Sequence, residues 1–177
     1  ILKTLIKLQS IKDKHVINFK NQKYKVKEYD NKILCNEANL FSEWYAPRKI
    51  NSYKMRSFEK KYKKEVKNLL LKLKFKNDTF VHRDFHISNL LYFKNNIAVI
   101  DSQDALIGNK AYDLASLVDD VRLKTSNKFK KKVLNYYLKK FKKNKTKKFI
   151  NDFEILSVVR NLKIIGIFMR LAARDNK

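Results

Sequence analysis

The most constraining feature of this sequence is a hairpin pattern that lies between polar residues. Residues 90–93 are apolar, residues 94–96 have the turn composition Lys-Asn-Asn, and residues 97–100 are apolar again. This pattern predicts two antiparallel strands joined by a tight turn. The first strand directly follows Asn89 and the second ends at Asp101. A tight hairpin therefore lets an amide and a carboxylate reach one common point.

A second carboxylate precedes the hairpin. Asp84 stands five residues before Asn89, in the segment His82-Arg83-Asp84. The order Asp, Asn, hairpin, Asp is the layout with which kinases transfer phosphoryl groups. That reaction needs a positioned hydroxyl and neutralisation of the phosphate charge. We predict that Asp84 orients the acceptor hydroxyl or accepts its proton. Asn89 and Asp101 are predicted oxygen ligands of Mg²⁺.

A family resemblance rests on these residues. The pattern HxDxxxxN, with an aspartate twelve residues after the asparagine, resembles the aminoglycoside-phosphotransferase and choline-kinase-like small-molecule kinases. VHRDFHISNLL, VIDSQDALIG and YDLASLVDD are similar to bacterial cell-wall sugar kinases, which phosphorylate the anomeric hydroxyl of N-acetylmuramate and N-acetylglucosamine. Residues 36–48 and 160–177 carry the same resemblance, which spans most of the chain. It implies ATP and Mg²⁺ as cofactors, a sugar acceptor, and a cytoplasmic role in cell-wall recycling.

The same resemblance implies a mainly α fold with a small β-hairpin, like the carboxy-terminal lobe of a protein kinase. A chain of 177 residues has the size of one domain, so we predict a single domain over residues 1–177. The two glycines, Gly108 and Gly166, cannot form a glycine-rich phosphate loop. No strand precedes the first helix to carry a phosphate-binding lysine. We therefore expect that the amino-terminal ATP lobe of a longer protein is missing and that this fragment alone is inactive.

Apolar residues at helical spacing predict helices at residues 1–11, 33–46, 51–75, 114–122, 125–141 and 149–173. The predicted helix caps are Ser52 or Ser57, Asp113, and Thr125 or Ser126. Residues 12–31 are polar without a clear period and predict a loop, and residues 142–148 predict a charged linker. Gly166 is expected to allow close packing between helices.

Further side chains near the predicted centre have both functional and structural interpretations. His86 could contact phosphate or substrate, or it could stabilise the loop. By resemblance, Gln103 and Asp104 could hold sugar hydroxyls, or they could form a bonded turn. His82 is expected to pack and to bond the backbone. In kinase-like folds an aspartate at the position of Asp113 also holds the backbone of the catalytic loop.

The segment around residues 33–46 carries aromatic and acidic side chains that suit a sugar. Glu37, Glu43 and Trp44 could therefore line the acceptor pocket. In the alternative interpretation, the aromatic side chains belong to the core and the acids are solvated. The sequence alone does not decide between these two roles.

The formal net charge of +25 suggests nucleic-acid binding. Lysine far outnumbers arginine, and the lysines occur along nearly every predicted helix, which favours a solvated basic surface. A single cysteine, Cys35, rules out a disulfide framework and indicates a reducing compartment. The apolar runs are shorter than the roughly 18 residues of a membrane span, so no membrane partner is expected.

Two kinds of alternative function stay open. The first is a kinase for another small acceptor, such as an aminoglycoside, choline or homoserine. The second is a basic, helical nucleic-acid-binding module. Steeply salt-dependent oligonucleotide binding without ATP turnover would favour the second alternative.

Overall fold

The computed structural model describes residues 1–121 and 123–174, and the chain forms two compact units. The first unit contains Ile1–Tyr29 and Lys74–Phe153, and the second contains Asp30–Leu73 and Glu154–Lys177. Helix α6 (Lys143–Arg174) contributes to both units. The prediction of a single domain over residues 1–177 stays a prediction. Position 122 and positions 175–177, which end two predicted segments, lie outside the described residues.

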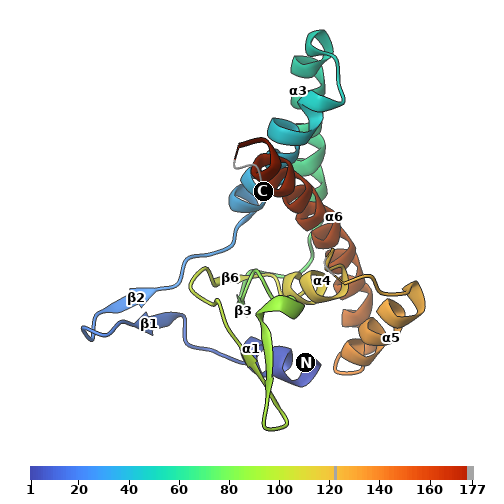
Figure 1. Cartoon of the computed structure of the whole chain (residues 1–177). Coiled ribbons are helices and arrows are strands. Elements are labelled where there is room, and N and C mark those ends of the chain that lie inside the picture. Colours follow the sequence, from blue (N-terminus) through green and yellow to red (C-terminus); the bar gives the residue numbers. More distant parts are fainter. Residues whose placement is uncertain (122, 175–177) are drawn as a thin grey trace. The chain divides into compact units, whose positions relative to one another are not determined.

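The first unit is built from short strands and helices. Its strand pairs are β1 (His15–Ile17) with β2 (Lys23–Lys25), β3 (Thr79–Val81) with β6 (Leu106–Gly108), and β4 (Leu90–Phe93) with β5 (Asn96–Val99), all antiparallel. Its helices are α1 (Leu2–Gln9), α4 (Tyr112–Val118), α5 (Asn127–Leu138) and the start of α6. The β3–β6 pair lies beside α4, and the β1–β2 ribbon extends away from that pair (Figure 1).

Aromatic side chains form much of the first unit's core. Tyr137 and Phe149 are fully buried, and their ring centroids lie 5.0 Å apart. Phe141 lies 5.0 Å from Phe149, and Phe75 lies 6.4 Å from both Phe141 and Phe149. These rings join the segment before β3 to α5 and α6. This packing anchors both ends of the stretch that contains the predicted catalytic loop.

The second unit is helical in the described part of the chain. It contains α2 (Asn31–Leu40), a π-helical turn (Phe41–Tyr45), a 3₁₀ turn (Ala46–Arg48), α3 (Ser52–Leu70) and the end of α6. A Cβ added at Gly166 would lie 2.4 Å from the carbonyl carbon of Leu40, so α6 approaches α2 at backbone distance. This confirms the close helix packing predicted at Gly166.

The mainly helical fold with small strand pairs is confirmed, and several local predictions are wrong. The predicted loop at residues 12–31 contains the β1–β2 ribbon, in which all six strand residues are exposed. A ribbon exposed on both faces needs no apolar alternation, which explains the missing signal. The predicted linker at residues 142–148 is helical from Lys143 onward, because lysine is a good helix former.

The helix caps show a similar mixture of outcomes. Ser126 accepts a hydrogen bond from the Phe129 N–H at 3.2 Å and caps α5 as predicted. Asn51 is the residue that precedes α3, and its side chain makes no capping hydrogen bond, so neither Ser52 nor Ser57 is the cap. Ala111 precedes α4, and Asp113 therefore lies inside the first turn of that helix rather than at its cap.

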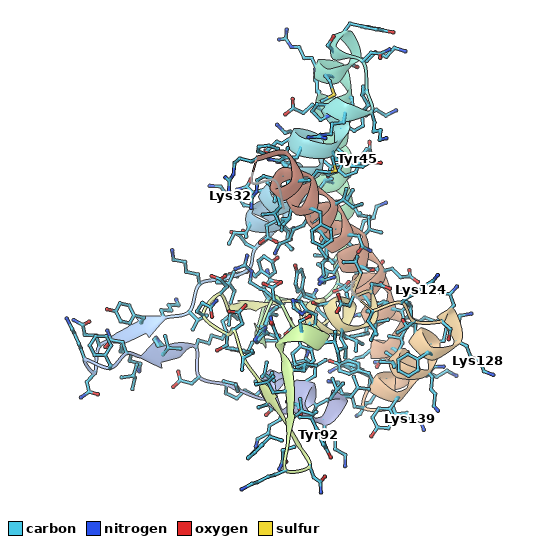
Figure 2. All side chains as sticks on the ribbon, in the orientation of Figure 1. Lys32, Tyr45, Tyr92, Lys124, Lys128 and Lys139 are labelled. Atoms are coloured by element: carbon cyan, nitrogen blue, oxygen red, sulfur yellow. The ribbon has the colours of Figure 1, made fainter. Side chains whose placement is uncertain are left out.

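The lysines are distributed over the surfaces of both units. Lys124, Lys128 and Lys139 are exposed side chains in and next to α5, and Lys32 is exposed on α2 (Figure 2). In the described residues no helix is both long enough and apolar enough to cross a membrane.

Candidate active site

A buried carboxylate holds the backbone at the start of the predicted catalytic loop. Asp113, which is 1% exposed, accepts hydrogen bonds from the backbone N–H groups of His82 at 2.8 Å and Arg83 at 3.0 Å. Arg83 has a φ of 73°, a left-handed conformation that is costly for a residue with a side chain. The two bonds to Asp113 stabilise this strained conformation. The residue that follows, Asp84, is therefore positioned by α4.

The loop then turns back on itself between Asp84 and Asn89. The Asn89 side-chain amide donates to the Asp84 carbonyl oxygen at 3.0 Å. The His86 N–H donates to the same carbonyl at 3.0 Å, and the Asn89 N–H donates to the His86 carbonyl at 3.0 Å. The Asn89 side chain uses its nitrogen in this contact, so its Oδ1 atom remains an acceptor. The contact brings the predicted metal-ligand residue next to the backbone of the predicted base.

The β4–β5 hairpin connects this loop to Asp101. Leu90 pairs with Val99, and the Ile100 N–H donates to the Asn89 carbonyl at 3.1 Å. Lys94 and Asn95 have φ values of 45° and 60°, as the two central residues of a type I′ turn require. The predicted hairpin is thus present with a tight turn that sets its register.

A buried histidine makes a second connection between the loop and the hairpin end. The His82 ring is 1% exposed, and its Nε2 atom lies 3.0 Å from the Ile100 carbonyl oxygen. Asp101 follows directly and has a φ of 67°. Its Oδ1 atom accepts a hydrogen bond from Gln103 Nε2 at 2.7 Å. The backbone directly before Asp101 is thereby tied to the segment that carries Asp84.

The carboxylates of this loop and hairpin are available for a ligand. In the described part of the chain the half-buried Asp84 carboxylate makes no hydrogen bond or ion pair, and the exposed Asp101 carboxylate contacts Gln103. The Asn89 Oδ1 atom and the Asp101 carboxylate offer oxygen ligands, which suit Mg²⁺. Mg²⁺ commonly takes only one or two protein carboxylates and leaves its other positions to water and phosphate. The residues present therefore fit this ion.

Other predicted contact residues have defined positions in the first unit. Arg83 donates from Nη1 to the Asp104 carbonyl at 3.0 Å, and its guanidinium lies 5.1 Å from the centre of the Tyr29 ring. Asp104 thus serves the loop through its backbone, while its side chain is exposed. His86 is 6% exposed, and Gln103 is engaged with Asp101. Sequence reasoning missed the stacking role of Tyr29, because no local pattern links it to a loop more than fifty residues away.

The three predicted acceptor residues belong to the second unit and are described within it. Glu37 on α2 forms a 3.2 Å ion pair with Lys163 on α6, and the two side chains are 14% and 12% exposed. Glu43 is exposed and Trp44 is half-buried in the π-helical turn. Glu37 is therefore an ion-pair partner in this structure rather than a solvated acid.

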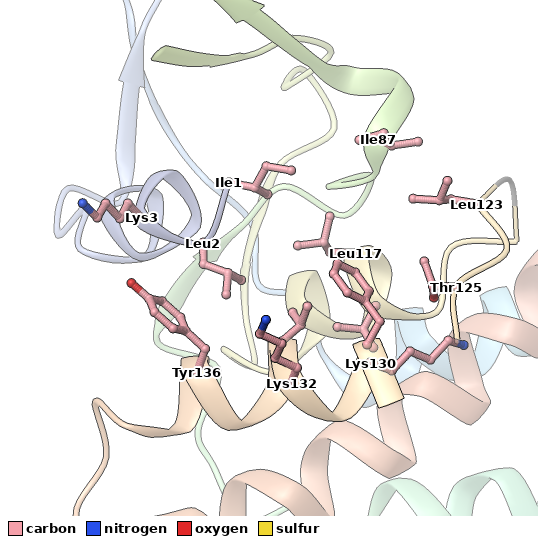
Figure 3. Close-up of a pocket in the computed structure, with 13 residues that line it drawn as sticks. Ile1, Leu2, Lys3, Ile87, Leu117, Leu123, Thr125, Lys130, Lys132 and Tyr136 are labelled. Carbon is pink, nitrogen blue, oxygen red and sulfur yellow. The ribbon is translucent and has the colours of Figure 1, made fainter. Parts of the chain in front are cut away.

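An apolar pocket of about 540 Å³ lies in the first unit beside the predicted catalytic loop. Side chains from α1, α4 and α5 face a common space together with Ile87 (Figure 3). Ile87 lies in the 3₁₀ turn between Asp84 and Asn89. Those two residues and Asp101 do not line this pocket. The pocket therefore borders the candidate active site without containing its polar groups.

Two side chains outside the predicted catalytic loop have shifted pKa values. Burial lowers the pKa of Lys140 to about 8, with repulsion from Lys110 as the smaller cause. The Lys140 amine lies 3.7 Å from the centre of the Tyr137 ring. In the second unit, burial raises the pKa of Tyr62, whose hydroxyl donates to the Ala38 carbonyl at 2.6 Å.

Comparisons with known proteins identify the family to which this sequence is similar. The sequence profile described as "Phosphotransferase enzyme family" matches residues 26–149. An N-acetylmuramate/N-acetylglucosamine kinase of Neisseria meningitidis is 33% identical over 162 residues, which cover 85% of this chain and 47% of that protein. Proteins of the same name from Pseudomonas aeruginosa and Caulobacter vibrioides are 31% and 26% identical over 84% and 92% of this chain. The chain spans about half the length of these relatives.

Proposed function

This chain belongs to the phosphotransferase enzyme family, and we propose that the protein carrying it transfers the γ-phosphoryl group of ATP to a hydroxyl of a small molecule. The proposed acceptor is the anomeric hydroxyl of N-acetylmuramate or N-acetylglucosamine. The proposed setting is the recycling of cell-wall sugars in the cytoplasm. The names of the relatives support this choice of acceptor.

The observation that carries the proposal is the connection between loop and hairpin. The Asn89 amide bonds the Asp84 carbonyl, and the Ile100 N–H bonds the Asn89 carbonyl. His82 then ties the Ile100 carbonyl back to the start of the loop. Phosphoryl transfer depends mainly on positioning and charge stabilisation. A braced set of one amide and two carboxylates supports that chemistry.

Each residue has a proposed task. Asp84 accepts a hydrogen bond from the acceptor hydroxyl, orients it toward the phosphorus atom, and takes its proton as the new bond forms. Asn89 Oδ1 and the Asp101 carboxylate hold Mg²⁺, which neutralises charge on the phosphate oxygens when bound. Asp113 and His82 keep the loop and the hairpin end in place. Gln103 orients the Asp101 carboxylate through its 2.7 Å bond.

The proposal is tested by offering a panel of acceptors to the purified protein that carries this chain. ATP consumption is measured with N-acetylmuramate, N-acetylglucosamine, an aminoglycoside, choline and homoserine, and NMR locates the new phosphate. We expect turnover with the amino sugars and phosphate on the anomeric oxygen. Turnover with choline, homoserine or the aminoglycoside instead would replace the proposed acceptor. Salt-dependent oligonucleotide binding without any ATP turnover would overturn the kinase proposal.

A further inference from the structure

Another carboxylate of the first unit, that of Asp152 on α6, is fully buried. Its Oδ1 atom accepts hydrogen bonds from the backbone N–H of Lys74 at 2.8 Å and from Asn151 Nδ2 at 2.9 Å. Its Oδ2 atom accepts hydrogen bonds from the backbone N–H of Phe75 at 2.9 Å and from Asn109 Nδ2 at 2.7 Å. Burial of a carboxylate is costly unless hydrogen-bond donors replace its water. These four donors are therefore held together around one point of α6.

Asn109 connects this carboxylate to the start of α4. It is buried and directly follows β6. While its side-chain nitrogen donates to Asp152, its Oδ1 atom accepts a hydrogen bond from the Ala111 N–H at 3.0 Å. The Asn109 carbonyl oxygen accepts a hydrogen bond from the Tyr112 N–H, also at 3.0 Å. Both of these N–H groups lie at the beginning of α4, whose first turn carries Asp113. The position of Asp113 therefore depends on Asn109, and the position of Asn109 depends on Asp152.

The two backbone contacts of Asp152 lie on the segment that leads into the predicted catalytic loop. Lys74 and Phe75 precede β3, and β3 ends directly before His82. The same strand pairs with β6, after which the chain enters α4. Asp152 thus holds both elements that meet at the loop. Their meeting point is the contact in which Asp113 accepts the His82 N–H at 2.8 Å.

We propose that Asp152 is a positioning residue of the candidate active site and acts through Asn109 and Asp113 on the placement of Asp84. This inference rests on the proposed function, in which Asp84 orients the acceptor hydroxyl. Phosphoryl transfer depends mainly on positioning, and a misplacement of about 1 Å can lower a rate about 100-fold. A carboxylate suits this task because both of its oxygens accept hydrogen bonds. An amide would offer one acceptor oxygen and would turn N–H groups toward the remaining donors.

Backbone hydrogen exchange in the protein that carries this chain tests the inference without requiring turnover. Asp152→Asn keeps the shape of the side chain and removes one acceptor oxygen. We expect exchange at the N–H groups of His82 and Arg83 to become at least about 10-fold faster, as for the loss of about one buried hydrogen bond. Exchange at the N–H groups of α5 should change much less, because only the loop and its supports are released. Asp119→Asn is the matched control, since it removes a carboxylate at the other end of α4, and it should leave exchange at His82 and Arg83 unchanged.

Kinetics with a compensating substitution separates positioning from general stabilisation. Asp152→Asn should lower kcat about 10- to 100-fold, with each rate divided by the folded fraction of the variant. Adding Asn109→Asp exchanges the two side chains, so that the amide on α6 donates to a carboxylate that still accepts the Ala111 N–H. The double variant should recover at least about 5-fold of the lost kcat, because residues in direct contact are coupled. Two substitutions that only destabilise the fold would lower kcat further.

The outcomes keep this inference apart from the proposed function. Equal acceleration of exchange throughout the first unit, unchanged exchange at His82 and Arg83, or an unchanged kcat in Asp152→Asn would overturn the inference. So would a double variant that recovers no activity. If Asp152→Asn does not fold, Asn109→Ala replaces it, because it removes the link to α4 and keeps the contacts before β3, and the same selective acceleration is expected. If the wild type phosphorylates neither sugar, the proposed function is wrong, and hydrogen exchange still decides whether Asp152 positions the loop.

Discussion

The buried Asp113 carboxylate provides the sharpest test of how this fold holds its candidate active site. Replacing Asp113 with alanine removes the acceptor of two backbone N–H groups, those of His82 and Arg83. Both bonds are charge-assisted, and the carboxylate is 1% exposed. Water therefore has little access to replace the lost acceptor. The N–H groups would be left buried and unpaired unless the loop moves.

The expected cost follows from these two contacts. Each buried donor left without a partner costs about 1–3 kcal/mol, so Asp113→Ala should lower the free energy of unfolding by about 2–6 kcal/mol. Relaxation of Arg83 from its φ of 73° would return about 1–3 kcal/mol but would displace Asp84. Asp113→Asn keeps one acceptor oxygen and should lose about half as much stability.

Urea unfolding followed by circular dichroism measures these changes. Asp104→Ala is the control, because the Asp104 side chain is exposed and Arg83 bonds the backbone carbonyl of Asp104, which the substitution keeps. The control should stay within about 0.5 kcal/mol of the wild type. An Asp113→Ala variant as stable as the control would refute the reasoning. A larger loss of unfolding free energy in Asp113→Asn than in Asp113→Ala would also refute it.

Three further predictions concern metal use, helix packing and pH. Asp101→Ala should abolish productive use of Mg²⁺-ATP, whereas Asp84→Asn should leave nucleotide binding nearly intact and lower kcat by about 10²- to 10⁴-fold; equal loss of nucleotide affinity in calorimetric titrations would contradict these roles. Gly166→Ala would place a Cβ 2.4 Å from the Leu40 backbone and should lower the free energy of unfolding by about 1–3 kcal/mol, measured by urea titration; an unchanged midpoint would show that the helices separate easily. Lys140 should lose its proton near pH 8 in an NMR titration of the lysine side chains. Because its pKa is lowered on folding, its contribution to stability should increase as pH rises from about 8 toward 10.5. A titration midpoint above pH 10 would contradict this lowered pKa.

Local patterns in the sequence were sufficient for the elements whose signals lie within a few residues. The hairpin at residues 90–100 was predictable, because Lys94 and Asn95 suit a tight turn and the flanking runs are apolar. The helices at α1, α5 and α6 followed from apolar spacing, and Ser126 was a recognisable cap. The spacing of Asp84, Asn89 and Asp101 also placed them at one loop and one hairpin end.

Other features depend on contacts between residues far apart in the chain, which no local pattern records. The local pattern suggested that Asp113 caps a helix, and the family resemblance suggested that it holds the backbone of the catalytic loop. The structure supplies the bonding partners of Asp113, which lie in a loop about thirty residues earlier. The β1–β2 ribbon was missed, because strands exposed on both faces need no apolar alternation.

Burial and pairing were decided by tertiary packing alone. Glu37 was predicted as a sugar contact or a solvated acid, and α6 brings Lys163 to within 3.2 Å of it. One turn away on the same helix, the Nη1 atom of Arg160 is enclosed without a hydrogen-bond partner among the described residues. A sequence states which charges exist, whereas the free energy of each charge depends on the groups that folding places around it.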